Sequence, residues 1–299
     1  MNIHPHSPSL PEKTYPPHLH PFETVIVDVT HRCNMACANC YIPERHPPDM
    51  DIDQLMSCIR QFPRRTNIRV AGAEPTLRKD LPEIISRIRS FGHRVALMTN
   101  GLRLAQRSYV ERLREAGLRH VYLSMNGAGN DAWYLAIDNL ACANKKLQAL
   151  ENILAARIIV NTGTILKRGV NEAAVAEMIG LLKRHAPRTA VVKFRNVGAL
   201  GRYDARAERQ NLSMAEMLAL VAREIGTDAE TLERYRAVKG YDEENSRLFP
   251  LDLTSAAGRG LWCKVTNWQA DALGRVDPGS RRRGRVTPDF KLAGFFETM

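Results

Sequence analysis

Six short runs rich in β-branched residues, each separated from the next by a stretch of helical periodicity, are the feature that most constrains the fold of this 299-residue chain. Strands that alternate with helices form βαβ units, and right-handed crossovers between such units build a parallel sheet that curls toward a barrel. We therefore predict an α/β protein built on a partial, TIM-like (β/α)6 barrel. The expected strands are Thr24–Thr30, Asn67–Gly72, Arg94–Thr99, His120–Met125, Arg157–Gly163 and Ala190–Asn196.

The stretches between and after these strands have the apolar period of amphipathic helices. The expected helices are Asp51–Phe62, Asp80–Phe91, Ala105–Ala116, Ala132–Leu150, Glu172–His185, Ser213–Ile225 and Ala229–Arg236. Three parts result: an extended Pro-rich arm at 1–23, the barrel core at 24–205, and a small C-terminal α+β extension at 206–299 that we expect to cap the substrate site. In the extension, residues 262–268 and 275–277 flank a turn and predict a hairpin.

Composition narrows the class of protein. An apolar fraction of 44% with 25% charged residues is typical of globular domains and excludes collagenous, disordered and disulfide-rich chains. The sequence has no apolar run of about 18 residues and no secretory signal core, so we expect a cytoplasmic protein that has no membrane partner. The formal net charge of +11 favours anionic partners.

Three of the six cysteines lie together, directly after the first expected strand, in the order Cys33-x3-Cys37-x2-Cys40. Ligands of parallel sheets bind at the carboxyl ends of the strands. Three thiolates on one short loop can hold three irons of a 4Fe-4S cluster and leave the fourth iron open to a cofactor or substrate. A zinc site completed by His31 or His46 is the alternative, but structural zinc loops usually come as two pairs of ligands, and no second cysteine pair occurs here.

This loop resembles the signature of the radical S-adenosylmethionine (SAM) superfamily, whose members share a partial (β/α)6 barrel. The resemblance covers residues 24–202 and implies one 4Fe-4S cluster bound by the three cysteines, with SAM as the second cofactor. One position departs from the family pattern. Many members have an aromatic residue just before the third cysteine, whereas this chain has Asn39 there and Tyr41 after it. The resemblance implies that the Asn39 backbone or Tyr41 replaces the aromatic contact to the adenine.

Later strand ends resemble the segments through which the family binds SAM. Residues 71–76, Ala-Gly-Ala-Glu-Pro-Thr, resemble the Gly-Gly-Glu-Pro motif whose exposed strand end binds the methionine ammonium; a simple Pro turn would not need the Glu. The SAM contacts that the resemblance implies are Gly72, Ala73, Glu74, Asn100, Ser124, Asn126, Thr162 and Arg195. Two of these residues have an alternative to a SAM contact. Asn126 could simply cap a turn, and Arg195 could belong to a solvated basic rim.

The remaining cysteines bear on the number of clusters. Cys58 and Cys142 lie on expected helices, where small buried thiols are common. Cys263 occupies the place where cluster-binding tails of the family have their first cysteine, but Pro278-Gly279 stands where another would follow. The resemblance thus implies a degenerate twitch/SPASM-like tail and one cluster per chain. Cys263 is then either a buried structural thiol or a hydrogen-atom donor to a substrate radical.

A basic run at 281–285, Arg-Arg-Arg-Gly-Arg, has three interpretations: a solvated surface loop, a rim that attracts an anionic small molecule or peptide, or a nucleic-acid contact. The sequence has no aromatic-rich RNA-binding module, zinc finger or long basic helix. We therefore expect no nucleic-acid partner.

The family resemblance implies an enzyme, an oxidoreductase or lyase, that cleaves SAM reductively to a 5′-deoxyadenosyl radical with an electron from a flavodoxin- or ferredoxin-type donor. We expect the radical to abstract hydrogen from a small anionic metabolite in a specialised biosynthetic pathway. One alternative is a peptide-modifying enzyme, for example an epimerase with Cys263 as hydrogen donor. An alternative of another class is an iron–sulfur sensor or electron carrier, which would not cleave SAM.

Overall fold

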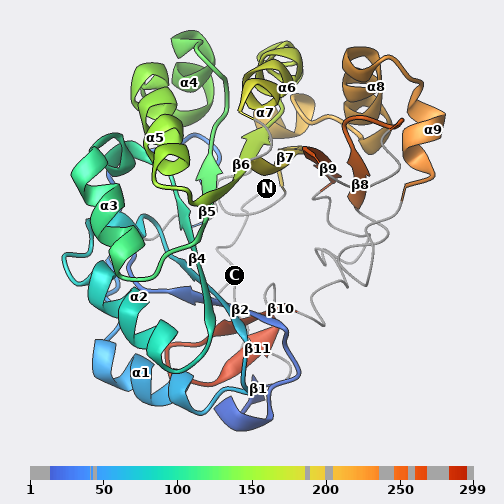
Figure 1. The fold of residues 1–299 in the computed structure, drawn as a ribbon. Coiled ribbons are helices and arrows are strands. Elements are labelled where there is room, and N and C mark those ends of the chain that lie inside the picture. Colours follow the sequence, from blue (N-terminus) through green and yellow to red (C-terminus); the bar gives the residue numbers. More distant parts are fainter. Residues whose placement is uncertain are drawn as a thin grey trace.

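The computed structural model describes residues 14–40, 42, 46–185, 189–198, 205–235, 246–254, 260–267 and 283–294. The strands of this part form one 11-stranded sheet in the order β1-β11-β10-β2-β3-β4-β5-β6-β7-β9-β8. In Figure 1 the sheet bends into an open arc with helices along its outer side, which confirms the predicted partial α/β barrel. All six predicted strands are confirmed as its parallel centre: β2 Thr24–Asp28, β3 Asn67–Ala71, β4 Arg94–Thr99, β5 His120–Ser124, β6 Ile159–Ile165 and β7 Thr189–Arg195.

The helices follow the predicted alternation with one difference. The stretch 132–150, predicted as a single helix, forms α4 Asp131–Asp138 and α5 Ala143–Ala155. Asn139 ends α4 in the left-handed conformation, with φ of 54°, which Asn adopts more readily than most residues. The other helices are α1 Ile52–Arg60, α2 Leu81–Ser90, α3 Arg107–Glu115, α6 Ala174–Arg184, α7 Ala205–Arg209, α8 Met214–Ile225 and α9 Ala229–Glu233, with short 3-10 turns at Pro17–Leu19, Pro75–Leu77 and Leu102–Ala105.

The C-terminal extension adds strands to both sides of the predicted core. On one side β9, Trp262–Thr266, pairs parallel with β7 and antiparallel with β8, Ser246–Pro250. On the other side β10, Arg283–Val286, pairs parallel with β2 and antiparallel with β11, Leu292–Gly294, which in turn pairs with β1, Thr14–Tyr15. Both edges of β9 are thus occupied, by β7 and β8. The prediction that β9 forms a hairpin with residues 275–277 is therefore wrong. Residues 275–277 lie outside the described part.

The basic run is a second correction. Arg281 and Arg282 lie outside the described residues, but Arg283 and Arg285 lie in β10 and are only 7% and 6% exposed, so this half is not a solvated loop. Arg285 is in register with Ile26 of β2, and its Nε lies 2.9 Å from Asp28 Oδ2. Strand pairing has drawn these residues into the sheet, where an acidic neighbour offsets part of their charge.

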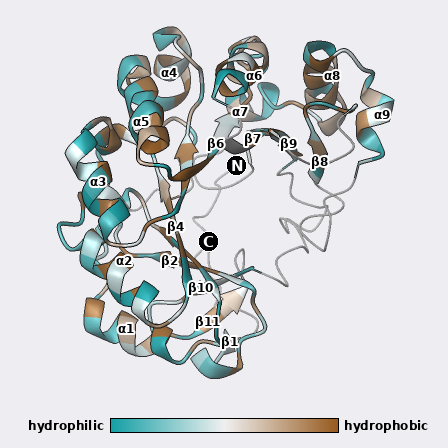
Figure 2. Cartoon of the chain, viewed as in Figure 1, coloured by the Kyte–Doolittle hydropathy of each residue, from teal (hydrophilic) through white to brown (hydrophobic). Residues whose placement is uncertain are grey.

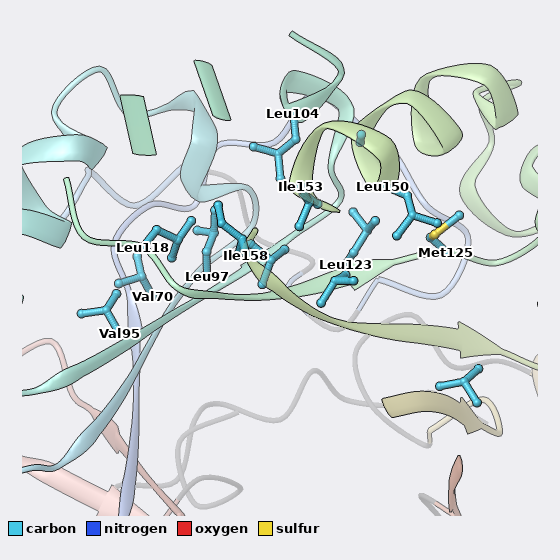
Figure 3. Packing of buried hydrophobic residues seen from close by; sticks show 14 of the residues in the cluster. Val70, Val95, Leu97, Leu104, Leu118, Leu123, Met125, Leu150, Ile153 and Ile158 are labelled. Carbon is cyan, nitrogen blue, oxygen red and sulfur yellow. The ribbon is translucent and has the colours of Figure 1, made fainter. Parts of the chain in front are cut away.

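The apolar core lies between the sheet and the helices. Side chains in register on neighbouring strands share a face, and one set of alternate positions is apolar. Val70, Leu97 and Leu123 belong to one buried cluster with Leu150 and Ile153 of α5 (Figure 3). Burial of each such side chain contributes about 1.5–3 kcal/mol to folding. The helices carry both hydrophobic and hydrophilic residues, as expected of a layer between sheet and solvent (Figure 2).

No helix in the described part of the chain is both long and apolar enough to cross a membrane.

Gly72 holds the end of β3 against the end of β2. Its φ is +125°, and a Cβ atom there would lie 2.3 Å from the Thr30 carbonyl oxygen. We expect Gly72→Ala to lower the free energy of unfolding by roughly 3 kcal/mol or more, because backbone strain and a steric clash add. Urea unfolding monitored by circular dichroism measures the loss.

Gly92→Ala is the matched control, since its φ is +86° but a Cβ atom there would meet no other atom within 4 Å. We expect it to lose only about 1–2 kcal/mol, the cost of the left-handed backbone. Equal losses in the two variants would contradict the steric role of Gly72.

Candidate active site

The three signature cysteines lie in the loop that follows β2, and all three are partly exposed. The loop is held by backbone hydrogen bonds at both ends. Near its start, Thr30 O accepts from Ala73 N, at 2.9 Å, and near its end Ala38 N donates to Ile137 O of α4, at 3.0 Å. The end of β3 and the helix α4 therefore set the path of the cysteine loop.

The donor set fits an iron–sulfur cluster, because three thiols from one short loop are the ligands such a cluster needs. In the described part of the chain, no three His, Cys, Asp or Glu side chains lie close enough to hold a metal ion. The zinc alternative with His31 or His46 finds no such group among these residues either.

The Cys37 thiol lies against Asp138 of α4. Burial, together with the neighbouring carboxylate of Asp138 and a hydrogen bond to it, raises the pKa of the Cys37 thiol to about 12. A thiol that coordinates a metal is deprotonated, so cluster binding and loss of this proton are coupled. Asp138 thus lies directly behind the cysteine loop.

Glu74 joins the end of β3 to the end of β4. Its carboxylate is fully buried and accepts hydrogen bonds from Thr99 Oγ1 and Asn100 N, both at 2.7 Å. The Glu74 side chain thus cross-links the two strand ends, and its contact with SAM stays a prediction. Gly72 is buried too, whereas Ala73 between them is partly exposed.

Asn126 joins the end of β5 to the end of β6. Its Oδ1 accepts from Ile165 N and its Nδ2 donates to Asp138 Oδ1, each at 2.9 Å. Asn171 Nδ2 completes the junction by donating to Asn126 O, at 3.0 Å, and to Ile165 O, at 2.8 Å. Asn126 is 1% exposed, and its side chain forms this junction instead of a simple turn cap; its contact with SAM stays a prediction.

Asn100 and Ser124 are half-buried residues at neighbouring strand ends. Asn100 Nδ2 donates to Asn34 Oδ1 at 2.8 Å and lies 4.0 Å from Cys33 Sγ. Ser124 is in register with Gly163 of β6 on the face away from the helices. The structure therefore brings these two predicted site residues beside the cysteine loop and the open face of the sheet.

Thr162 and Cys263 lie on the opposite, helix-covered face. Thr162 is in register with Leu123 and Val192, and Cys263 with Val192, all of them buried. Cys263 is fully buried in the main apolar cluster, and burial raises the pKa of its thiol. The structure therefore does not bring Thr162 and Cys263 together with the cysteine loop, and their predicted roles stay predictions.

The other predicted contacts lie near the loop or at the end of β7. Asn39 is partly exposed within the cysteine loop. Tyr41 lies outside the described residues. Arg195 ends β7 in register with Thr266.

Lys146 and Asp138, which lie behind the strand ends, were not among the predicted site residues. Both were part of a stretch interpreted only as amphipathic helix, where charged residues usually face solvent. The signal for Lys146 is its spacing, since Ala143 and Leu150 of the same buried helix face lie three positions before it and four after it.

We expect Cys33→Ala, Cys37→Ala and Cys40→Ala each to reduce the iron content of anaerobically reconstituted protein from about four atoms per chain to near zero, because a loop with two thiols no longer holds the cluster. Iron and sulfide analysis with the visible absorbance measures this.

Cys263→Ala is the control, because its thiol lies in the apolar core. It should keep the full iron content. Loss of iron in Cys263→Ala, or its retention in the three loop variants, would contradict the assignment.

Comparison with known proteins agrees with this geometry. The family model of the radical SAM superfamily matches residues 27–182. The chain is 30% identical over 223 residues to 7,8-dihydro-6-hydroxymethylpterin dimethyltransferase of Methanocaldococcus jannaschii, covering 69% of this chain and 42% of that protein. It is 28% identical over 247 residues to GTP 3',8-cyclase of Xanthomonas axonopodis pv. citri, covering 75% of this chain and 71% of that protein.

Solved structures share the fold. Streptococcus suis SuiB bound to the precursor peptide SuiA has a TM-score of 0.57 at 12% identity, over 67% of this chain and 44% of that one. The enzyme anSMEcpe with bound AdoMet and the Kp18Cys peptide has a TM-score of 0.54 at 18% identity, over 68% and 59%. The chain thus spans less than half the length of the dimethyltransferase and of SuiB. With its cysteine loop after β2 and a family match over half its length, this chain belongs to the radical SAM superfamily of enzymes, which use a 4Fe-4S cluster and SAM.

Proposed function

We propose that this radical SAM enzyme abstracts a hydrogen atom from a small anionic metabolite in a specialised biosynthetic pathway, with an electron from a flavodoxin- or ferredoxin-type donor. The bound cofactors supply a 5′-deoxyadenosyl radical. The residues of the chain bind the substrate, hold it in one orientation and exclude water. The observation that carries the proposal is the charge on the face of the sheet turned away from the helices, here called the inner face.

The inner face is strongly basic. Register with Ile26, Ala71 and Met98, which form a small cluster of their own, identifies its positions on each strand. In the described strands, Asp28 is its acidic residue. Its basic residues are Arg69, Arg94, Lys193, Arg195, Lys264, Arg283 and Arg285. A concave surface with this excess of positive charge attracts phosphate and carboxylate groups.

Lys193 and Lys264 concentrate that charge next to the expected SAM site. They are in register on the neighbouring strands β7 and β9, about 4.8 Å apart in the sheet. Gly163 precedes Lys193 in the same row, and a Cβ atom there would meet nothing within 4 Å. Ser124 begins the row. An anionic group bound by the two lysines would therefore lie beside the strand end that carries Ser124.

Planar side chains lie deeper on the same face. The Arg69 guanidinium lies 4.5 Å from the centre of the Tyr122 ring, and the His120 and Tyr122 rings are 4.5 Å apart. Burial, then the positive charge of Arg69, lowers the pKa of His120, so the ring is neutral at pH 7. A surface of planar groups next to cationic ones suits a heterocycle that carries phosphate, and the relatives named GTP 3',8-cyclase support this substrate class.

The alternatives have less support. The epimerase version of peptide modification needs an accessible donor thiol, and Cys263 is buried on the other face. SuiB and anSMEcpe are described with bound peptides, but their low identity extends only to the fold. A sensor or electron carrier has no need for the SAM cofactor that the family uses.

Anaerobic reconstitution followed by dithionite and SAM tests the radical chemistry, with 5′-deoxyadenosine measured by chromatography. We expect its formation to increase when a nucleoside triphosphate such as GTP or a sugar phosphate is added, and inorganic pyrophosphate to compete with that increase. Stimulation by uncharged analogues alone, without competition by pyrophosphate, would contradict the proposed substrate class.

We expect Lys264→Gln to raise the KM for the stimulating anionic compound by about tenfold, because a charge-assisted contact is lost. Lys145→Gln on the exposed side of α5 is the matched control and should leave the KM unchanged. If both variants keep the wild-type KM, the lysine row does not bind the substrate.

A further inference from the structure

Lys146 is a fully buried lysine on α5. Its Nζ donates hydrogen bonds to Asn100 O, at 2.5 Å, and to Ser124 O, at 2.9 Å. These carbonyls stand at the carboxyl ends of β4 and β5. Lysines are almost never fully buried unless they are paired, so the contact of one ammonium group with two strand ends defines a specific role for this residue.

The ladder between β4 and β5 ends at the pair Thr99 and Leu123, so Asn100 and Ser124 each lie one residue beyond it. Parallel strands bond to each other along the ladder, but beyond the last pair the carbonyl groups need other donors. Lys146 supplies these donors from the helix layer and does so for both ends at once. Beyond the last ladder pair, Lys146 therefore links the Asn100 and Ser124 backbones through one group.

Asn100 is held from both sides. Glu74 accepts its backbone N–H at 2.7 Å, while Lys146 donates to its carbonyl oxygen at 2.5 Å. Its side chain remains directed to the cysteine loop through Asn34, at 2.8 Å. Movement of Lys146 would therefore be transmitted to the residue that contacts the cluster loop.

The surroundings of Lys146 connect it to the same loop a second time. The ammonium group lies 5.7 Å from the centre of the Tyr134 ring on α4. It also interacts electrostatically with Asp138. The Asp138 carboxylate accepts hydrogen bonds from the Asn126 side chain and from the Cys37 thiol. Lys146 thus stands between the β4, β5 and α4 segments that surround the cysteines.

We propose that Lys146 is a positioning residue for SAM: it fixes the strand ends of Asn100 and Ser124 relative to each other and to the cysteine loop. The residue does not touch the ligand. It keeps the two half-buried residues at the separation that one ligand molecule can bridge. The proposal concerns SAM binding and does not depend on the identity of the substrate.

The test compares Lys146→Met with Lys145→Met in protein reconstituted with its cluster. Met fills a similar volume but removes the donors, whereas Lys145 is exposed on the same helix. Equilibrium dialysis with labelled SAM gives the Kd, iron analysis gives the cluster content, and thermal unfolding gives the Tm. We expect Lys146→Met to keep its iron but to bind SAM about tenfold more weakly or worse, and Lys145→Met to match the wild type.

Lys146→Gln separates positioning from mere stability, because its amide still donates to carbonyl oxygens. We expect its SAM affinity to fall between those of the wild type and Lys146→Met, and it provides the comparison if the Met variant does not fold. A variant series in which the Tm falls while the Kd for SAM stays at the wild-type value would overturn the proposal. So would equal SAM affinity of the Gln and Met variants.

Discussion

The ends of the parallel strands are the constraint on which this structure depends. Ligands of such sheets bind where the strands stop, and there the backbone groups lose their ladder partners. In this chain a series of buried polar side chains satisfies them. Glu74 joins β3 to β4, Lys146 joins β4 to β5, and Asn126 with Asn171 joins β5 to β6. The cysteine loop and the partly exposed residues that we expect to bind SAM lie next to these buried side chains.

The two faces of the sheet differ in burial and in charge. The helix-covered face is apolar and supplies stability, whereas the inner face is basic and is the face that we propose binds the substrate. A cationic interior costs free energy through the repulsion of like charges. The ion pair of Arg285 with Asp28 offsets part of that cost on β10. An anionic substrate that binds at Lys193 and Lys264 would offset it where the proposed reaction takes place.

The barrel was predictable because alternation of β-branched and amphipathic segments is a local pattern. The cysteine loop was predictable because the spacing of its three cysteines is that of a cluster-binding loop. Roles were harder to predict, since they depend on the face and depth of each side chain. Thr162 follows the expected strand pattern, but its register places it beside Leu123 on the helix-covered face. Glu74 lies in the segment predicted to bind SAM, but its side chain is fully buried. The strands β8 and β10 were missed because Pro250 and the arginine-rich run do not look like strand sequence.

The parallel pairing of β10 with β2 has a consequence for biosynthesis. It joins Gly284 to Val25, residues far apart along the chain. Contacts of such long range form late, because the entropy of closing the intervening loop opposes them. During translation the outer edge of β2 is therefore left without its partner until residues 283–286 have left the ribosome. An uncovered β-edge invites pairing with other chains, so the arrival of β10 protects the strand that leads into the cysteine loop.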